Sequence, residues 1–146
     1  MKNSYINRCK PDMNDYGPEP FIVNIESATK QNNNYRTTLW TGEDLQVTLM
    51  CIPPCGEIGL EAHHDNDQLL RIEEGCGVAM LGPAKERLNY QKNVCAGHIV
   101  MVPARTWHNI VNTGSCPLKL YAVYAPPHHP HGTVHRTKEI ADIQGD

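Results

Sequence analysis

Short segments in which β-branched and other apolar residues mix with polar ones recur along most of the chain. Most of them end at a glycine, a proline or a polar stretch, which is typical of β-strands bounded by turns. Segments 69–75 and 77–82 meet at Gly75 and Gly77, and we expect them to pair as a hairpin. The full set of expected strands is 21–28, 35–42, 45–52, 69–75, 77–82, 98–103, 107–114 and 118–127.

The apolar positions do not keep the period of an α-helix over any long stretch, and only residues 137–143, TKEIADI, predict a short helix. Many short strands joined by glycine- and proline-containing turns predict an all-β sandwich or barrel. We expect this barrel to occupy residues 21–126. Residues 1–20 are polar and proline-containing, so they predict a flexible N-terminal arm, and residues 127–146 follow as a C-terminal extension.

Composition supports this picture of one small globular domain. Of 146 residues, 40% are hydrophobic and 20% charged, and 11 glycines, 11 prolines and a single Phe argue against a helical bundle. The net charge of −3 gives no indication of a nucleic-acid surface. No apolar run approaches the roughly 20 residues that span a bilayer. The first residues contain no apolar signal-peptide region, so we expect a cytoplasmic protein without a membrane partner.

The cysteines are expected to be reduced. Without a signal peptide, thiols are expected rather than disulfides. The closest pair, Cys51 and Cys55 in CIPPC, has a spacing that fits neither a redox C-x-x-C motif nor a zinc knuckle. We therefore expect a structural role for all of them, as small buried side chains: Cys9, Cys51, Cys55, Cys76, Cys95 and Cys116.

The stretch 59–75, GLEAHHDNDQLLRIEEG, holds the candidate chemistry. In an extended segment alternate side chains share a face, so Glu61 and His63 project to one side and His64 to the other. A turn through HDND would return the next strand antiparallel and bring Gln68 beside this pair. His108, in VPARTWHNIVN, comes from a further strand. The pattern brings together two imidazoles and two side chains that carry oxygen.

The second half of this pattern resembles the second motif of the cupin superfamily, G-x5-P-x-G-x2-H-x3-N. The matching positions are Gly97, Pro103, Arg105, His108 and Asn112, with every spacing kept and Arg105 in place of the usual glycine. A glycine at that point serves a tight turn, so Arg105 implies an unusual but allowed φ angle or some strain.

The first cupin motif, G-x5-H-x-H-x3–4-E-x6-G, is matched with two changes of residue type. Glu61 stands for the first histidine, His63 for the second and Gln68 for the glutamate, before Gly75. The opening glycine falls on Cys55. The resemblance covers about residues 40–126.

The chain therefore resembles a small single-domain cupin of the mannose-6-phosphate isomerase-like type. The resemblance implies a jelly-roll β-barrel, also called a double-stranded β-helix, with one divalent metal ion inside and a homodimeric assembly. It implies Glu61, His63, Gln68 and His108 as metal ligands, with Zn, Fe, Mn or Ni as candidate metals. Gln68 is the poorer donor and could instead hydrogen-bond from outside the coordination shell. The alternative is a metal-free cupin whose pocket is held by hydrogen bonds.

We expect most residues next to the candidate ligands to have structural roles. His64 is expected to face solvent, and Asp65 and Asp67 to form the turn. Trp107 is expected to point away from the metal and to pack within the sandwich. Arg105 near the barrel mouth is either solvated or a contact for an anionic substrate.

The segment 126–135, PPHHPHGTVH, contains four histidines and three prolines. The prolines make it stiff and extended, and the segment offers no carboxylate to complete a metal site. We expect an arm that packs across the barrel or a partner subunit, and its histidines could capture metal adventitiously.

Three functions remain open. The first is a metal-dependent enzyme in which Glu61, His63 and His108 act on a small polar or sugar-like substrate as an isomerase or epimerase. The same ligands with iron would instead suit dioxygenase chemistry. The others are a module that binds a small molecule without catalysis, and a metal-free structural or sensing protein.

Overall fold

The computed structural model describes residues 15–145, which form nine strands and two helices. The strands are β1 (Arg36–Thr41), β2 (Gln46–Ile52), β3 (Asp67–Glu74), β4 (Cys76–Gly82), β5 (Tyr90–Cys95), β6 (Ile99–Val102), β7 (Trp107–Asn112), β8 (Leu118–Ala125) and β9 (Val134–His135). The helices are α1 (Ile25–Gln31) and α2 (Lys138–Ile143). The all-β expectation is confirmed, and so is the short helix near the C-terminus.

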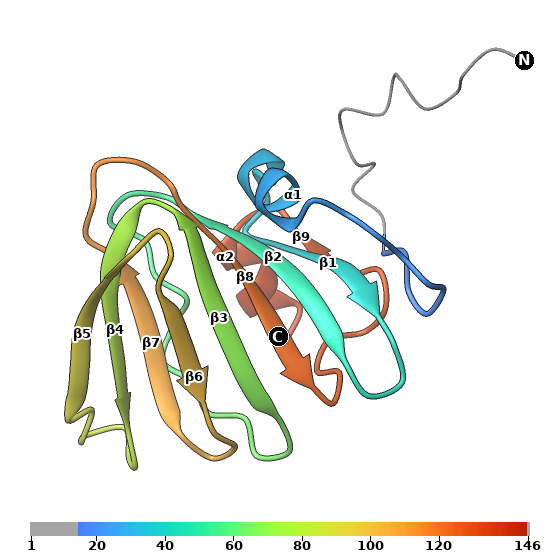
Figure 1. Cartoon of the computed structure of the whole chain (residues 1–146). Helices are drawn as coiled ribbons and strands as arrows, with labels where there is room; N and C mark the ends of the chain where they lie inside the picture. Colours follow the sequence, from blue (N-terminus) through green and yellow to red (C-terminus); the bar gives the residue numbers. More distant parts are fainter. Residues whose placement is uncertain (1–14, 146) are drawn as a thin grey trace, which may run out of the picture.

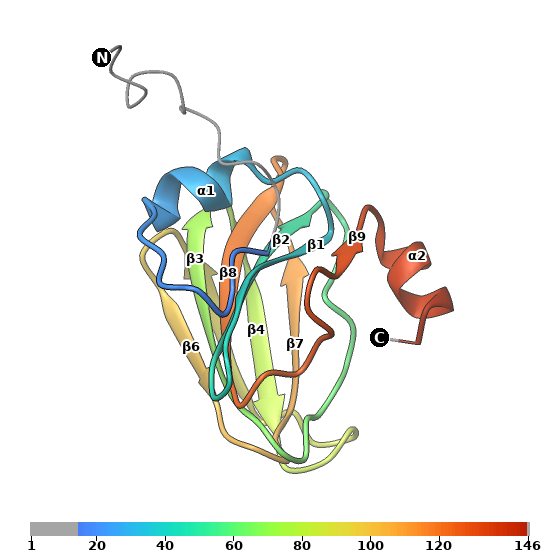
Figure 2. The same ribbon diagram turned by 90° about the vertical axis from the view of Figure 1, so that its right-hand side faces the viewer.

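The strands form two antiparallel sheets that face each other (Figures 1 and 2). The larger sheet has the order β6-β3-β8-β2-β1-β9, and the smaller one has the order β5-β4-β7. Strands adjacent in sequence repeatedly lie in different sheets, as in a jelly roll. The predicted sandwich is therefore a jelly-roll barrel.

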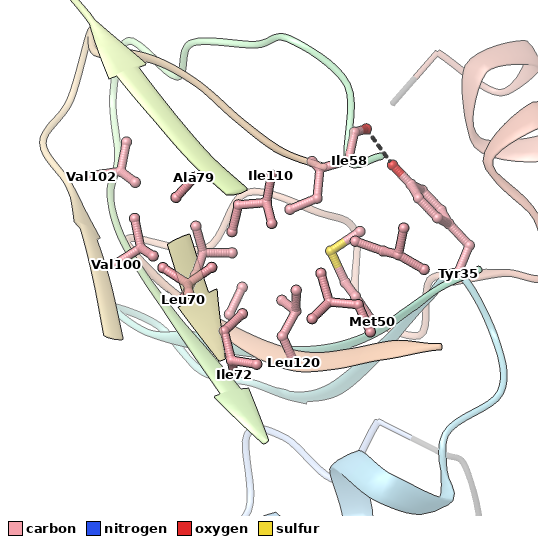
Figure 3. Packing of buried hydrophobic residues seen from close by; sticks show 14 of the residues in the cluster. Tyr35, Met50, Ile58, Leu70, Ile72, Ala79, Val100, Val102, Ile110 and Leu120 are labelled. Carbon is pink, nitrogen blue, oxygen red and sulfur yellow. Dashed lines mark hydrogen bonds between the residues drawn. The ribbon is translucent and has the colours of Figure 1, made fainter. Parts of the chain in front are cut away.

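The main core fills the space between the sheets (Figure 3). Burial alternates along β3, so that Leu70 and Ile72 point inward with Gln68, and Leu120 of β8 lies beside Ile72 in the register. Ile110 of the smaller sheet closes the core from the other side. Buried and more exposed side chains alternate in this way when only one face of a sheet packs against the other sheet.

The expected hairpin of residues 69–75 and 77–82 is wrong. β3 pairs with β6 and β8, whereas β4 pairs with β5 and β7, so the chain changes sheet at this point. Gly75 makes the change with a φ of 87°, and a Cβ there would lie 2.8 Å from the Pro117 carbonyl oxygen. Because tight turns and sheet crossings both use glycine, the sequence signal alone could not separate them.

The expected strand at residues 21–28 is also wrong, because its second half belongs to α1. Asn24 caps the helix, and its side chain accepts a hydrogen bond from the Ser27 backbone N–H at 3.0 Å. Glu26 and Lys30 form an ion pair one turn apart. Ala28 is buried against Leu49 of β2, so α1 covers part of the outer face of the larger sheet.

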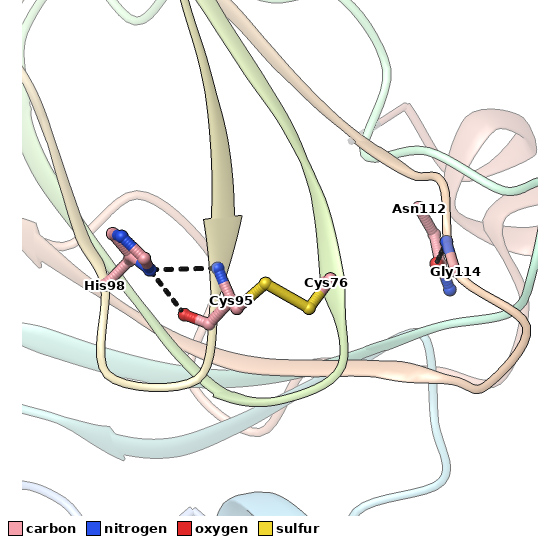
Figure 4. The surroundings of a disulfide bond; sticks show 5 residues. All are labelled: Cys76, Cys95, His98, Asn112 and Gly114. Carbon is pink, nitrogen blue, oxygen red and sulfur yellow. Dashed lines mark hydrogen bonds between the residues drawn. A yellow bond between two sulfur atoms is a disulfide. The ribbon is translucent and has the colours of Figure 1, made fainter.

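A disulfide joins Cys76 and Cys95, which corrects the expectation of reduced thiols for these two residues (Figure 4). They are opposite partners in the register of β4 and β5, with Cα atoms 4.1 Å apart. β5 was not predicted from the sequence, so the pairing that places these two cysteines, 19 residues apart, opposite each other could not be predicted either. Cys51, Cys55 and Cys116 are free thiols, as expected. The expected burial is wrong for them, because Cys55 and Cys116 are exposed and Cys51 is half-buried. Cys9 lies outside the described residues.

The two ends of the described chain meet on β1. The predicted N-terminal arm lies mostly outside the described residues, but its last residues lie against β1, and the Tyr16 N–H donates to the Leu39 carbonyl. The Asp15 carboxylate accepts hydrogen bonds from Thr41 and from the Gly132 backbone. Neither described helix is long and apolar enough to cross a membrane.

Candidate metal centre

Residues 59–64 lie along β7 of the smaller sheet. Glu61 forms an isolated antiparallel bridge with His108, in which each backbone N–H donates to the other carbonyl at 3.1 and 2.9 Å. The expected return of the Gln68 strand beside Glu61 and His63 is wrong, because β3 belongs to the larger sheet. Direct pairing with β7 instead places Glu61 beside His108.

Glu61, His63 and His108 bring their donor atoms within 4.8 Å of one another. The Nε2 atom of His63 lies 3.2 Å from Oε1 of Glu61, and the Nε2 atom of His108 lies 3.5 Å from the same oxygen. The side chains are largely buried, with 8% of His63, 2% of His108 and 26% of Glu61 exposed. Two imidazoles therefore converge on one carboxylate at the edge of the barrel interior.

The backbone sets the orientation of the His108 ring. Its Nδ1 lies 2.9 Å from the Thr106 carbonyl oxygen, which can only accept, so Nδ1 carries a hydrogen. In the neutral ring Nε2 then has a free lone pair. This buried Nε2 has no hydrogen-bond partner among residues 15–145, because 3.5 Å to Glu61 is too long. A second-nitrogen hydrogen bond to a carbonyl is how proteins orient a metal-binding imidazole.

The carboxyl group of Glu61 is held in its charged form. Burial by itself would raise the pKa of Glu61, but the imidazoles of His108 and His63 beside its carboxylate outweigh this effect. The pKa of Glu61 therefore lies far below its ordinary value. An ionised carboxylate between two imidazoles is suited to bind a cation.

Gln68 faces the same interior from the opposite sheet. It is 3% exposed, and its Oε1 has no hydrogen-bond partner within the described chain. Its register partner in β8 is Tyr124, whose ring centroid lies 5.6 Å from that of His63. A buried amide oxygen without a partner is costly, so this atom is available to a ligand in the barrel.

Arg105 has the unusual backbone that its place in the motif implies, with a φ of 67°. Its backbone N–H donates to the His63 carbonyl at 2.7 Å, so the turn directly supports the segment that carries Glu61 and His63. Its guanidinium is exposed and donates to the His64 carbonyl at 3.3 Å. His64 itself is exposed, as expected. Cys55, at the other substituted glycine position, has a φ of 66°.

Asp67 lies where the sequence predicted, whereas Trp107 does so only in part. Asp67 accepts a hydrogen bond from the Ala104 N–H, in keeping with a role in the loop. Trp107 points away from His108, but it does not pack between the sheets. It is half-buried on the outer face of the smaller sheet, and the Lys85 ammonium lies 4.9 Å from its ring centroid.

Two neighbours of the site, Tyr124 and His128, were not predicted from the sequence. The His128 ring centroid lies 4.1 Å from that of His63, and Tyr124 lies next to both rings. The inward position of Tyr124 could have been predicted from alternation along β8, in phase with Leu120 and Ala122. The place of His128 could not, because it follows a proline-rich turn without a regular period.

The jelly roll and its interior cluster of histidine and carboxylate define the class, and the chain belongs to the cupin family. Residues 48–124 match the family described as "Cupin domain". YrkC of Bacillus subtilis is 58% identical over 141 residues, which cover 97% of this chain and 75% of YrkC. L612 of Acanthamoeba polyphaga mimivirus is 36% identical over 115 residues, covering 78% of this chain and 70% of L612.

A solved structure shows the same fold. The crystal structure of BH2720 from Bacillus halodurans has a TM-score of 0.88 and 54% sequence identity to this chain. The similarity covers 89% of this chain and 98% of BH2720. The cupin assignment made from the two motifs is thus confirmed.

Proposed function

We propose that the chain binds one divalent metal ion through Glu61, His63 and His108. The observation that carries the proposal is the buried, unsatisfied Nε2 of His108, which faces the Glu61 carboxylate beside a second imidazole. Without a cation, a buried lone pair beside an anion is unfavourable. A metal ion would satisfy all three donor atoms at once.

The donor set fits the metals that proteins hold with nitrogen and oxygen ligands. Imidazole suits Zn, Fe and Ni, and carboxylate extends the choice to Mn. Gln68 adds a neutral amide oxygen from the other sheet, either as a fourth ligand or as a hydrogen-bond acceptor for a bound molecule. Three protein ligands leave a coordination position for water or a substrate.

We propose that the site acts on a small polar or sugar-like molecule, as an isomerase or epimerase. The metal would supply Lewis-acid polarisation of a carbonyl or hydroxyl group. Glu61, kept ionised by its two imidazole neighbours, would hold the metal and balance its charge. Gln68 would accept a hydrogen bond from a substrate hydroxyl. Arg105 could reach an anionic group at the rim if its guanidinium left the His64 carbonyl.

A second candidate follows from the same ligand count. Two histidines and one carboxylate are the ligands of the facial triad in non-haem iron oxygenases. Iron-dependent dioxygenase chemistry is therefore the alternative enzyme, and a non-catalytic metal- or ligand-binding cupin is the alternative to both. Turnover assays with phosphosugars, keto acids and diols, in the presence and absence of oxygen, separate the three. We propose a cytoplasmic location.

Metal content tests the proposal. The wild-type protein, stripped by chelator, reloaded and passed through a desalting column, is expected to retain about one ion per chain. His63→Ala and His108→Ala should retain much less, because each removes one of three ligands. His131→Ala is the matched control, since this imidazole is 54% exposed and contacts Asp15. Equal metal content in all four proteins, or none in the wild type, would contradict the proposal.

A further inference from the structure

His128 touches the metal site without belonging to its donor cluster. Its ring is tilted by 59° against that of His63, with the centroids 4.1 Å apart. It also lies 5.4 Å from Tyr124 at an angle of 24°, a stacked arrangement. The donor atoms that converge within 4.8 Å in the described residues are those of Glu61, His63 and His108. The contact of His128 with the His63 ring therefore links it to this cluster.

Two buried amides fix the backbone that carries His128. Gln46 is 0% exposed, and its Oε1 accepts from the backbone N–H groups of His128 and His129 at 3.0 and 2.9 Å. Its Nε2 donates to the His129 carbonyl at 2.8 Å. Asn66, 6% exposed, donates from its side-chain amide to the carbonyls of Pro126 and Pro127.

These contacts make segment 126–129 part of the barrel wall. Buried amide groups need hydrogen-bond partners, and both Gln46 and Asn66 find theirs in the backbone of this irregular segment. His129 extends the wall inward, because it is 7% exposed and its Nε2 lies 3.4 Å from the Tyr124 hydroxyl. The segment expected to be a packing arm is therefore built into one side of the site.

His128 and His63 differ in their exposure to solvent. His128 is exposed, whereas only 8% of the His63 side chain is exposed. The exposed His128 therefore packs against an almost buried imidazole and covers part of its surface, and the buried Tyr124 contacts both rings. Rotation of the His63 ring away from Glu61 would break the packing against His128.

We infer that His128 is a positioning residue of the metal site: it holds the His63 ring toward Glu61 and shields that ring from solvent. The inference rests on the proposed metal binding, and it concerns how long the metal stays rather than whether it binds. Loss of a residue that orients a metal ligand typically weakens metal binding by about 10- to 100-fold. Loosening of His63 should therefore appear mainly as faster metal release.

Cobalt release tests the inference on the full chain. Co²⁺ serves as the probe, because its visible absorption reports both occupancy and ligand geometry. After excess chelator is added, His128→Ala is expected to lose Co²⁺ about tenfold faster than the wild type, with an altered visible band. His128→Phe keeps a flat ring and should restore most of the wild-type rate, whereas His128→Gln, without a ring, should behave like His128→Ala.

The controls separate this inference from a fold defect and from the proposed function. His131→Ala removes a histidine from the same segment that contacts Asp15 and Gly17, and it should release Co²⁺ at the wild-type rate. Melting temperatures of the metal-free proteins identify any variant that is generally unstable. Wild-type release rates in His128→Ala and His128→Gln would overturn the inference and leave metal binding intact. A wild-type protein that binds no Co²⁺ would overturn both.

Discussion

Two single residues hold a backbone conformation that normally belongs to glycine. Cys55 and Arg105 have φ angles of 66° and 67°, and both stand where the cupin motifs have glycine. A left-handed conformation costs a residue with a Cβ roughly 1–2 kcal/mol. The motif resemblance identified both positions, and both have the left-handed backbone that glycine adopts most easily.

Arg105 allows the cost of this backbone to be measured. Arg105→Gly relieves the strain but adds freedom to the unfolded chain, so the free energy of unfolding should change by less than about 1 kcal/mol. Arg105→Val places a β-branched residue at the same φ and should destabilise by about 1–3 kcal/mol. Denaturant unfolding measures both. Gly97→Ala is the reference for strain alone, because a Cβ there would meet nothing within 4 Å. Equal stability of the Val and Gly variants would contradict this interpretation.

Asp15 makes the stability depend on pH. Burial would raise the pKa of its carboxyl group, but hydrogen bonds from Thr41, Gly132 and Gly17 hold the pKa below its ordinary value. A carboxylate with a lowered folded-state pKa stabilises the protein above its unfolded-state pKa, about 4, and loses this contribution as the pH falls through the folded value.

Asp15→Asn should therefore be less stable than the wild type at pH 7, and the difference should shrink below about pH 4. Urea unfolding between pH 2.5 and 7 measures this. Asp142→Asn provides a control carboxylate, since 61% of the Asp142 side chain is exposed in an ion pair within α2. A wild-type advantage that is constant over this pH range would contradict the assigned role of Asp15.

At the scale of elements, local patterns predicted most strands and failed where tertiary contacts decide. β2, β6, β7 and β8 follow directly from apolar alternation and turn residues. α1 was missed because the apolar and β-branched residues at the start of segment 21–28 favoured a strand, whereas the Asn24 cap and the contact of Ala28 with β2 establish a helix. β5 was missed because its first four residues are exposed and only Val94 is buried.

The disulfide between β4 and β5 predicts a redox-dependent stability. It closes a loop between residues 19 positions apart, and a loop of about this length contributes roughly 3 kcal/mol in the chain-entropy estimate. Cys76→Ala should lower the free energy of unfolding by about this amount, and a reducing agent should lower that of the wild type equally. Cys116→Ala, an exposed free thiol, is the control. A wild-type midpoint that is insensitive to reduction would contradict a stabilising disulfide.

At the scale of the whole molecule, the sequence predicted the barrel and three members of its site, but not how they meet. The cupin motifs identified Glu61, His63 and His108, whose donors do converge. Alternation within one segment suggested a hairpin with Gln68, whereas the structure brings β7 and β3 together from opposite sheets. Such long-range pairing is set by the packing of the whole core, which one short pattern does not contain.

We propose that the homodimer implied by the family resemblance forms through β6, at the edge of the larger sheet. β6 is an edge strand of that sheet, and Ile99 and Met101 are 52% and 61% exposed. We expect sedimentation to give twice the 16.4 kDa of one chain. Met101→Glu should shift the mass toward one chain, whereas Val134→Glu, on the opposite edge strand β9, should not. A monomeric wild type, or equal effects of both variants, would contradict a dimer through β6.

The central claim is that a metal ion binds between Glu61, His63 and His108. The most direct test is anomalous diffraction from a crystal of the reloaded protein, collected on both sides of the absorption edge of the metal. We predict one strong anomalous peak within about 2.0–2.3 Å of Nε2 of both histidines and of a carboxylate oxygen of Glu61. A peak only beside the exposed His131, or no peak inside the barrel at full metal loading, would contradict the account.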